Sequence, residues 1–168
     1  MVRSMTTVHD FKLKTIDGQM KSLADYRGKV LLVVNVASRC GLTPQYKALE
    51  EVYREYQEDG FEVLGFPCND FAGQEPAAES EIKSFCSTNY DVTFPLFAKV
   101  KVLGEHKEPL YDFLTKQATQ PDGPGDVAWN FAKFVVGKDG QIVARFSPKV
   151  APDDADIAEA IERALGSD

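Results

Sequence analysis

Between Val30 and Val36 the chain carries seven residues, of which six are apolar and four are valine. Apolar side chains stand at both odd and even positions, so the run predicts a central strand that other elements cover on both faces. Cys40 follows this strand closely, and Pro44 suits the first turn of a helix. A strand, a tight turn and a helix place the Cys40 sulfur at the carboxyl edge of a sheet, beside the unpaired N–H groups that open the helix. With Arg39 adjacent, this position favours a thiolate, and hence a reactive cysteine over an inert buried one.

The rest of the chain alternates between strand and helix patterns. Alternating residues around Asp17-Gly18 predict a β-hairpin from Phe11 to Ser22, and apolar residues at helical spacing predict a helix from Pro44 up to Asp59-Gly60. The other expected elements are strands at Phe61–Phe66, Phe94–Val100, Lys133–Val136 and Ile142–Phe146, and helices from about Ser80, at Glu108–Gln117 and at Pro152–Leu165. This order predicts an α/β protein with a thioredoxin-like fold, in which helices flank a central mixed β-sheet and a hairpin precedes it.

Length and composition are those of an ordinary globular domain. A chain of 168 residues buries about two-thirds of the surface that it exposes when unfolded. We therefore expect one domain over residues 1–168, with residues 1–7 as a loose N-terminal extension. No stretch is apolar for long enough to form a membrane span or the core of a signal peptide. A cytoplasmic location without stable membrane insertion is the resulting expectation.

Several classes of partner and site are disfavoured by the charges and histidines. A net charge of −7, with no cluster of Lys and Arg, argues against nucleic acid as a partner. His9 and His106 have no Cys or second His at ligand spacing, so no metal site is expected. Asp153, Asp154 and Asp156 lack the pattern of a calcium loop and are expected to cap the last helix instead. The sequence thus predicts no metal and no tightly bound cofactor.

The chain has three cysteines, Cys40, Cys68 and Cys86. An odd number cannot pair completely within one chain, and no Cys-x-x-Cys dithiol is present. In a reducing compartment such thiols indicate reactivity more than a disulfide framework.

Four segments carry the motifs that identify a family. In order they are Asn-Val-Ala-Ser-Arg-Cys-Gly-Leu-Thr (35–43), Gly-Phe-Pro-Cys-Asn-Asp-Phe (65–71), Gly-Gln-Glu-Pro (73–76) and Trp-Asn-Phe-Ala-Lys-Phe (129–134). Together they closely resemble the glutathione peroxidase family, in the branch that uses cysteine where other members carry selenocysteine. The resemblance runs from about Val8 to Leu165, and four motifs in one order are far more specific than any one alone.

The chemistry of this family requires donors around a reactive sulfur. A thiolate attacks one oxygen of the peroxide O–O bond, so both the sulfur anion and the departing oxygen need hydrogen-bond donors. Gln74, Asn130 and the indole N–H of Trp129 can supply them. The resemblance implies that Cys40 is the peroxidatic residue and that these three residues complete a catalytic tetrad. Hydrogen peroxide and organic or lipid hydroperoxides are the implied substrates.

The first step leaves a sulfenic acid on Cys40, which a second thiol can capture as a disulfide. By the resemblance, Cys86 matches the resolving position of members that thioredoxin recycles; a tryparedoxin-like protein or glutathione is the less favoured reductant. Cys86 also lies four residues after Ile82 on an apolar stripe, so it can equally be a packed helix position in the reduced state. Because a disulfide needs Cα atoms within about 7 Å, we expect this helix to unwind locally if reduced Cys86 packs inward.

Four further residues have expected roles outside the tetrad and the resolving step. Cys68 is the less favoured resolving thiol and is expected to be structural. Asp70 departs from the uncharged residue that is commoner in the family, and its carboxylate could disfavour the Cys40 thiolate or repel anionic substrates. Arg39 and Lys133 either attract the reductant or are solvated surface charges.

Two other functions remain open beside the peroxidase. One is a peroxide sensor or redox relay that passes the disulfide of Cys40 to a partner protein, which needs the same site chemistry. The other is a thioredoxin-fold binding module without catalysis, which would make the tetrad an accident. The short loop between Gln117 and Trp129 lacks the insertion found at the interface of tetrameric family members, so we expect a monomer or a weak dimer.

Overall fold

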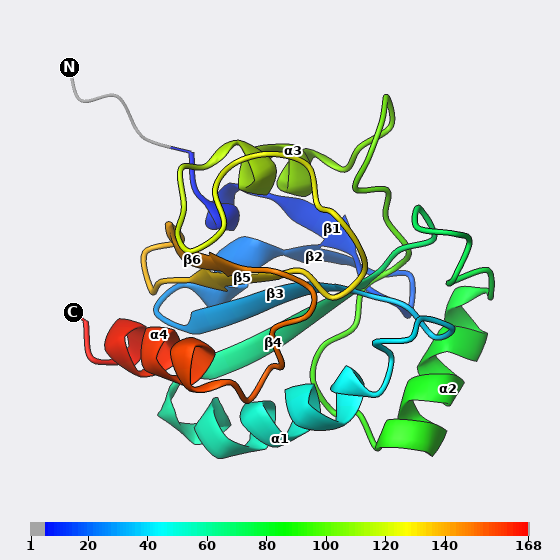
Figure 1. Cartoon of the computed structure of the whole chain (residues 1–168), viewed down its shortest axis with the longest axis horizontal. Helices are drawn as coiled ribbons and strands as arrows, with labels where there is room; N and C mark the ends of the chain where they lie inside the picture. Colours follow the sequence, from blue (N-terminus) through cyan, green and yellow to red (C-terminus); the bar gives the residue numbers. More distant parts are fainter. Residues whose placement is uncertain (1–5, 168) are drawn as a thin grey trace.

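A mixed four-stranded sheet lies at the centre of residues 6–167, the part of the chain that the structure, a computed structural model, describes (Figure 1). Its strands, in spatial order, are β4 (Phe61–Pro67), β3 (Val30–Val36), β5 (Lys133–Val136) and β6 (Ile142–Phe146). β3 pairs parallel with β4 and antiparallel with β5, which pairs antiparallel with β6. A separate N-terminal hairpin joins β1 (Lys12–Lys14) and β2 (Met20–Ser22). These elements confirm the predicted hairpin and mixed sheet.

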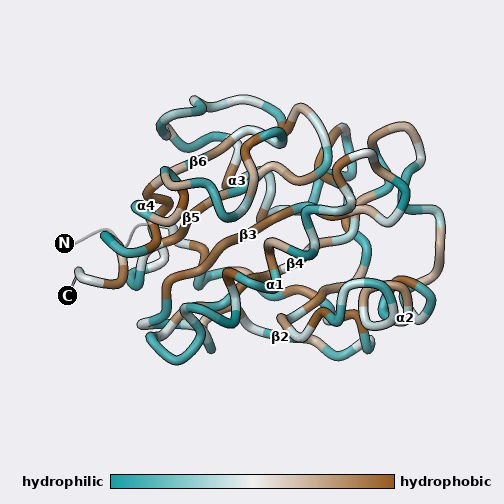
Figure 2. Tube along the Cα trace, turned by 60° about the horizontal axis from the view of Figure 1, so that its bottom comes forward, coloured by the Kyte–Doolittle hydropathy of each residue, from teal (hydrophilic) through white to brown (hydrophobic). Residues whose placement is uncertain are grey.

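The central strand β3 is buried along its whole length, as its composition predicts. Side chains at even positions, such as Leu32 and Val34, join one hydrophobic core, whereas Leu31 and Val33 join the other. The two cores lie on opposite faces of the sheet because successive side chains of a strand point to opposite sides. The apolar trace of β3 through the middle of the molecule is visible in Figure 2.

Helices cover both faces of the sheet. They are α1 (Gln45–Tyr56), α2 (Glu79–Tyr90), α3 (Pro109–Lys116) and α4 (Ala155–Leu165), with short 3-10 helices at Val8–Asp10, Leu23–Tyr26 and Gln57–Asp59. α1 and α4 pack on one face, α3 and the hairpin cover the other, and α2 lies beyond the end of the sheet beside α1 (Figure 1). No helix within residues 6–167 is long and apolar enough to cross a membrane.

Local signals set the ends of these helices. Gly60, with φ 96°, reverses the chain between α1 and β4 in a left-handed conformation that suits glycine. Asp154 caps α4 by accepting a hydrogen bond from the Asp156 backbone N–H at 2.8 Å, as expected for this acidic stretch. The helix therefore starts at Ala155, three residues after the predicted Pro152.

The segment from Phe94 to Val100 forms isolated bridges in place of the predicted strand. Phe97 N–H donates to Gly65 O on β4 at 2.9 Å, but the next residue, Ala98, donates to Lys14 O on the hairpin at 2.9 Å. Pro95 has no N–H to donate. The segment therefore divides its hydrogen bonds between two sheets and completes neither ladder.

Residues 1–5, which make up most of the expected N-terminal extension, lie outside the described residues. Thr7, the last residue of the expected extension (residues 1–7), forms a capping box with the 3-10 helix at Val8–Asp10. Its hydroxyl accepts from His9 N–H at 3.1 Å, and its own N–H donates to the Asp10 carboxylate at 2.8 Å.

Candidate active site

Cys40 lies in the turn between β3 and α1 and is 7% exposed. Its backbone N–H donates to Thr43 Oγ1 at 2.9 Å, and the Thr43 hydroxyl donates to Ala37 O at 2.7 Å. These bonds fix the turn. The backbone N–H of Leu42 points at Cys40 Sγ at 3.3 Å. The sequence predicts that the first N–H groups of the helix face this sulfur. Because α1 begins only at Gln45, the N–H group that does so belongs to the turn itself.

Trp129, Gln74 and Asn130 come from two distant loops and meet at this turn. The indole N–H of Trp129 donates to Cys40 Sγ at 3.3 Å. Gln74 is held beside the turn because its carbonyl accepts the backbone N–H of Arg39 at 3.0 Å. Asn130 Nδ2 donates to Gln74 Oε1 at 3.1 Å. The structure thus brings together four of the five residues for which the sequence predicts a role in catalysis.

Asn35 positions this loop, although the sequence offers only one hint of that role. It is the polar residue within the apolar strand β3, and it is completely buried. Asn35 Nδ2 donates to Trp129 O at 3.1 Å, and Asn35 Oδ1 accepts from Ala132 N–H at 3.0 Å. Between them Phe131 adopts a left-handed φ of 70°, which is unfavourable for a side chain of this size. The side-chain bonds of Asn35 hold this bend, which presents Trp129 and Asn130 together.

Cys86, the fifth predicted residue, is completely buried on α2 in the core that Cys40 also borders. Burial raises the pKa of the Cys86 thiol to about 11, which the nearby Tyr46 hydroxyl opposes and Glu75 reinforces. Cys40, Cys68 and Cys86 are all free thiols. The packed position that the sequence allows for reduced Cys86 is therefore the one observed.

Cys68 is completely buried in the other core, on the opposite face of the sheet from Cys40 and Cys86. Burial raises the pKa of its thiol to about 12. A thiol that packs in the other core is a poorer partner for Cys40 than Cys86, which shares the core of Cys40. Its surroundings therefore favour a structural role.

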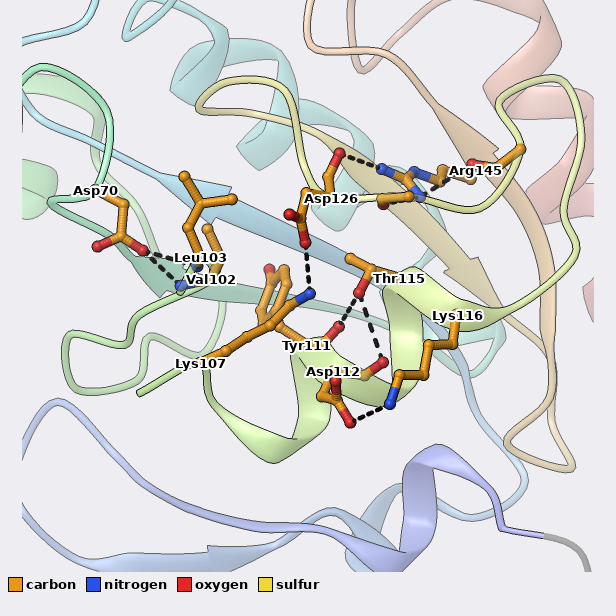
Figure 3. A network of polar contacts seen from close by, with 12 residues as sticks. Asp70, Val102, Leu103, Lys107, Tyr111, Asp112, Thr115, Lys116, Asp126 and Arg145 are labelled. Carbon is orange, nitrogen blue, oxygen red and sulfur yellow. Dashed lines mark hydrogen bonds and ion pairs between the residues drawn. The ribbon is translucent and has the colours of Figure 1, made fainter. Parts of the chain in front are cut away.

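The carboxylate of Asp70 binds a loop (Figure 3). It accepts the backbone N–H groups of Val102 and Leu103 at 2.6 and 3.1 Å, and Lys101 Nζ lies 3.5 Å away. These contacts compensate its charge locally, whereas the sequence suggests an influence on Cys40. They indicate a structural role in fixing the loop.

We expect Asp70→Ala to lower the free energy of unfolding by about 2 kcal/mol, because two backbone N–H groups lose a charged acceptor. The second-order rate constant of Cys40 with hydrogen peroxide should stay unchanged. Urea denaturation and competition kinetics measure the two quantities. As a control, Lys101→Ala removes only the exposed ion pair and should have little effect on stability. A faster reaction with unchanged stability would instead show that the Asp70 charge acts on Cys40.

Lys133 is neither a solvated surface charge nor available to attract a reductant, so both roles that the sequence leaves open for it are wrong. It is completely buried, and its Nζ donates to the carbonyls of Pro148 and Val150, the former at 2.8 Å. Burial lowers the pKa of this amine to about 7. Lys133 therefore ties down the chain after β6 and is not available to attract a reductant, whereas Arg39 is exposed.

No group of three or more His, Cys, Asp or Glu side chains within residues 6–167 is arranged to hold a metal ion. Two donors contact the Cys40 sulfur, one indole and one backbone N–H, and the amide side chains of Gln74 and Asn130 are joined to each other beside the turn. Such a set can stabilise a sulfur anion and a departing oxygen anion in a site largely shielded from water.

Comparison with known proteins places the chain among characterised relatives. The family model for "Glutathione peroxidase" matches residues 8–115. "Thioredoxin/glutathione peroxidase BtuE" of Escherichia coli is 45% identical over 180 residues, covering 96% of this chain and 96% of the relative. "Hydroperoxy fatty acid reductase gpx1" of Synechocystis is 47% identical over 166 residues, covering 95% and 96%.

Solved structures agree with this placement. The crystal structure of Trgpx in apo form superposes with a TM-score of 0.80 at 38% identity and covers 98% of each chain. At 19% identity, a thioredoxin family protein from Chlorobium tepidum shares the fold, with a TM-score of 0.65 and coverage of 99% and 100%. The predicted thioredoxin-like fold is therefore confirmed.

Proposed function

This chain belongs to the glutathione peroxidase family and is a thiol peroxidase, and we propose that Cys40 is the residue that attacks the peroxide. The observation that carries this proposal is the 3.3 Å contact between the Trp129 indole N–H and Cys40 Sγ. With the Leu42 N–H at the same distance, two donors point at the sulfur.

In the first step, Cys40 Sγ forms a bond to one peroxide oxygen while the O–O bond breaks. The sulfur becomes a sulfenic acid, and the other oxygen leaves as water or an alcohol after it takes up a proton. Gln74 and Asn130 are the proposed donors to that departing oxygen. Their mutual hydrogen bond uses Gln74 Oε1, which leaves the Gln74 NH₂ group to donate.

In the second step, we propose, Cys86 attacks the sulfenic acid and forms a disulfide with Cys40, releasing water. Cys86 is supported over Cys68 because it borders the same core as Cys40. It is completely buried, so α2 must open locally for the two sulfurs to meet. Thioredoxin is the proposed reductant of this disulfide because Cys86 supplies a second thiol, with a tryparedoxin-like protein or glutathione as weaker alternatives. The name of the Escherichia coli relative includes both thioredoxin and glutathione.

The proposed substrates are hydrogen peroxide and organic or lipid hydroperoxides. Lipid hydroperoxides are supported by the name of the Synechocystis relative, "Hydroperoxy fatty acid reductase gpx1". We further propose that residues 1–168 act as one peroxidase domain, as a monomer or weak dimer in the cytoplasm. The short connection between Gln117 and Trp129 supports that oligomeric state.

Steady-state consumption of NADPH with hydrogen peroxide tests the reductant. Thioredoxin with its reductase should support turnover at least about tenfold faster than glutathione with its reductase, because a dithiol resolves a mixed disulfide intramolecularly. Faster turnover with glutathione would contradict the role of Cys86. Turnover with neither would contradict the whole cycle.

A further inference from the structure

Glu75 follows Gln74 directly and carries a carboxylate that the peroxidase chemistry above does not use. The residue is 0% exposed, and neither carboxylate oxygen has a hydrogen-bond partner among residues 6–167. Its backbone is well held, because its N–H donates to Asn69 Oδ1 at 2.8 Å. Ser38 favours the ionised form of this carboxyl, but burial outweighs it. A carboxylate this buried is costly, so its presence here calls for an explanation in terms of function.

Two other polar groups beside Glu75 are also buried without partners. They are the hydroxyl of Tyr46 on α1 and the hydroxyl of Ser38, two residues before Cys40. Tyr46 lies beside the Cys86 thiol, and Glu75 raises the pKa of both groups. The carboxylate therefore lies near enough to interact electrostatically with both the turn of the peroxidatic cysteine and the buried thiol of α2.

The protonation states of these groups make a proton acceptor necessary. Burial raises the pKa of Cys86 to about 11 while α2 is closed, and even a free thiol, with a pKa of about 8.5, is mostly protonated at pH 7. Burial also raises the pKa of the Glu75 carboxyl, which brings it closer to neutral pH, where a general base works best. The groups that face this carboxylate are Ser38, Arg39, Lys99, Tyr46 and Cys86.

We propose that Glu75 is the general base of the resolving step and takes the proton of Cys86 as that sulfur attacks the sulfenic acid of Cys40. This inference rests on the proposed role of Cys86. The S–S bond forms as the S–O bond of the sulfenic acid breaks. The proton passes from the Cys86 thiol to Glu75 and then to the departing hydroxide, which leaves as water. No further oxidant or reductant is needed, because the peroxide has already oxidised Cys40.

The backbone keeps Glu75 with Cys40 when α2 opens. Gln74 O accepts the Arg39 N–H at 3.0 Å, and Glu75 N–H is bonded to Asn69, so the acid is anchored to the peroxidatic side of the site. Cys86, on α2, is the group that moves. A base fixed beside the electrophile can meet the arriving thiol.

Glu75→Gln tests this role, since the amide has the shape of the acid but cannot accept the proton. Trp129 is the single tryptophan and contacts Cys40 Sγ, so its fluorescence can follow both steps after rapid mixing with one equivalent of hydrogen peroxide. The rate of the phase that depends on peroxide concentration, the oxidation of Cys40, should be unchanged. The peroxide-independent phase, disulfide formation, should slow by about 100-fold at pH 7.

The pH profile separates a base from a merely structural residue. In the unmodified protein, the rate of disulfide formation should rise as the Glu75 carboxyl ionises and then level off. In Glu75→Gln it should rise by about tenfold per pH unit without levelling until the Cys86 thiol itself ionises. Glu75→Asp, which keeps a carboxylate, should retain the level region and serves in place of the Gln variant if that variant does not fold.

Stability gives an independent check on the carboxyl. Because its pKa is raised in the folded state, its contribution to stability is complete below the ordinary value of 4.5 and is lost as the pH rises toward the folded value. The free energy of unfolding of the unmodified protein should therefore fall relative to that of Glu75→Gln over this pH range. If the two stabilities did not diverge over this pH range, the raised pKa of the Glu75 carboxyl would be wrong.

Cys86→Ser distinguishes this proposal from the function on which it rests. If that variant still forms an intramolecular disulfide, detected by intact mass, the role of Cys86 is wrong and the base has no step to serve. If it forms none, but Glu75→Gln resolves at the normal rate and with the normal pH profile, only the role of Glu75 is wrong. Equal slowing of both phases in Glu75→Gln would likewise overturn the proposal, since it would indicate a general distortion of the site.

Discussion

Cys40→Ser should lower kcat/KM for hydrogen peroxide by at least about 10⁴-fold, because an unactivated hydroxyl is a far weaker nucleophile than a thiolate. Serine is close to cysteine in size, and the bonds that hold the turn use the backbone N–H of residue 40 and the side chain of Thr43. The turn should therefore keep its shape. The loss should come from the chemistry of the sulfur alone.

Competition kinetics under single-turnover conditions measure this loss without any reductant. Near-ultraviolet circular dichroism provides the control for folding, since Trp129 lies against the substituted atom and would report a displaced loop. Residual activity above about one per cent in a folded variant would show that another thiol performs the attack.

Cys86→Ser should separate the first half of the cycle from the second. One equivalent of peroxide should still oxidise Cys40 at the normal rate, because Trp129, Gln74 and Asn130 are untouched. Steady-state turnover with thioredoxin should fall by about 100-fold, because the sulfenic acid has no internal thiol to resolve it. Under excess peroxide, the mass of the variant should show sulfinic acid accumulating at Cys40.

Cys68→Ser is the matched control, since it also removes a completely buried thiol. It should retain thioredoxin-dependent turnover, although a hydroxyl in that apolar core will lower stability. If Cys68→Ser lost turnover and Cys86→Ser kept it, the assignment of the resolving cysteine would be reversed.

Local patterns predicted most of the fold. The apolar residues of Val30–Val36 and the turn signals at Asp17-Gly18 each act over a few neighbouring residues, and both elements formed as expected. Phe94–Val100 also has a strand-like composition, yet it formed no strand because its hydrogen bonds go to both β4 and the hairpin. That division depends on where two distant segments lie, which local composition does not encode.

For the site, too, local motifs predicted part of the arrangement and tertiary packing decided the rest. The motifs predicted Cys40, Gln74, Trp129 and Asn130, and the structure brings their side chains together. What the motifs could not give was burial. Glu75 and Lys133 read as ordinary charged residues of a loop and a strand end, but both are completely buried. Their unusual ionisation arises from the tertiary packing around them.

The two hydrophobic cores also determine which oxidation errors the folded protein can make. Cys40 and Cys86 border one core and Cys68 lies in the other, with the four-stranded sheet between them. A cross-link between Cys40 and Cys86 needs one peripheral helix to open, whereas a cross-link to Cys68 has to join thiols of two different cores. The sheet therefore acts as a partition that keeps a third thiol from scrambling the cycle. Cross-linking of Cys68 to either of the others would therefore report a rearrangement of the fold and not a step of the cycle.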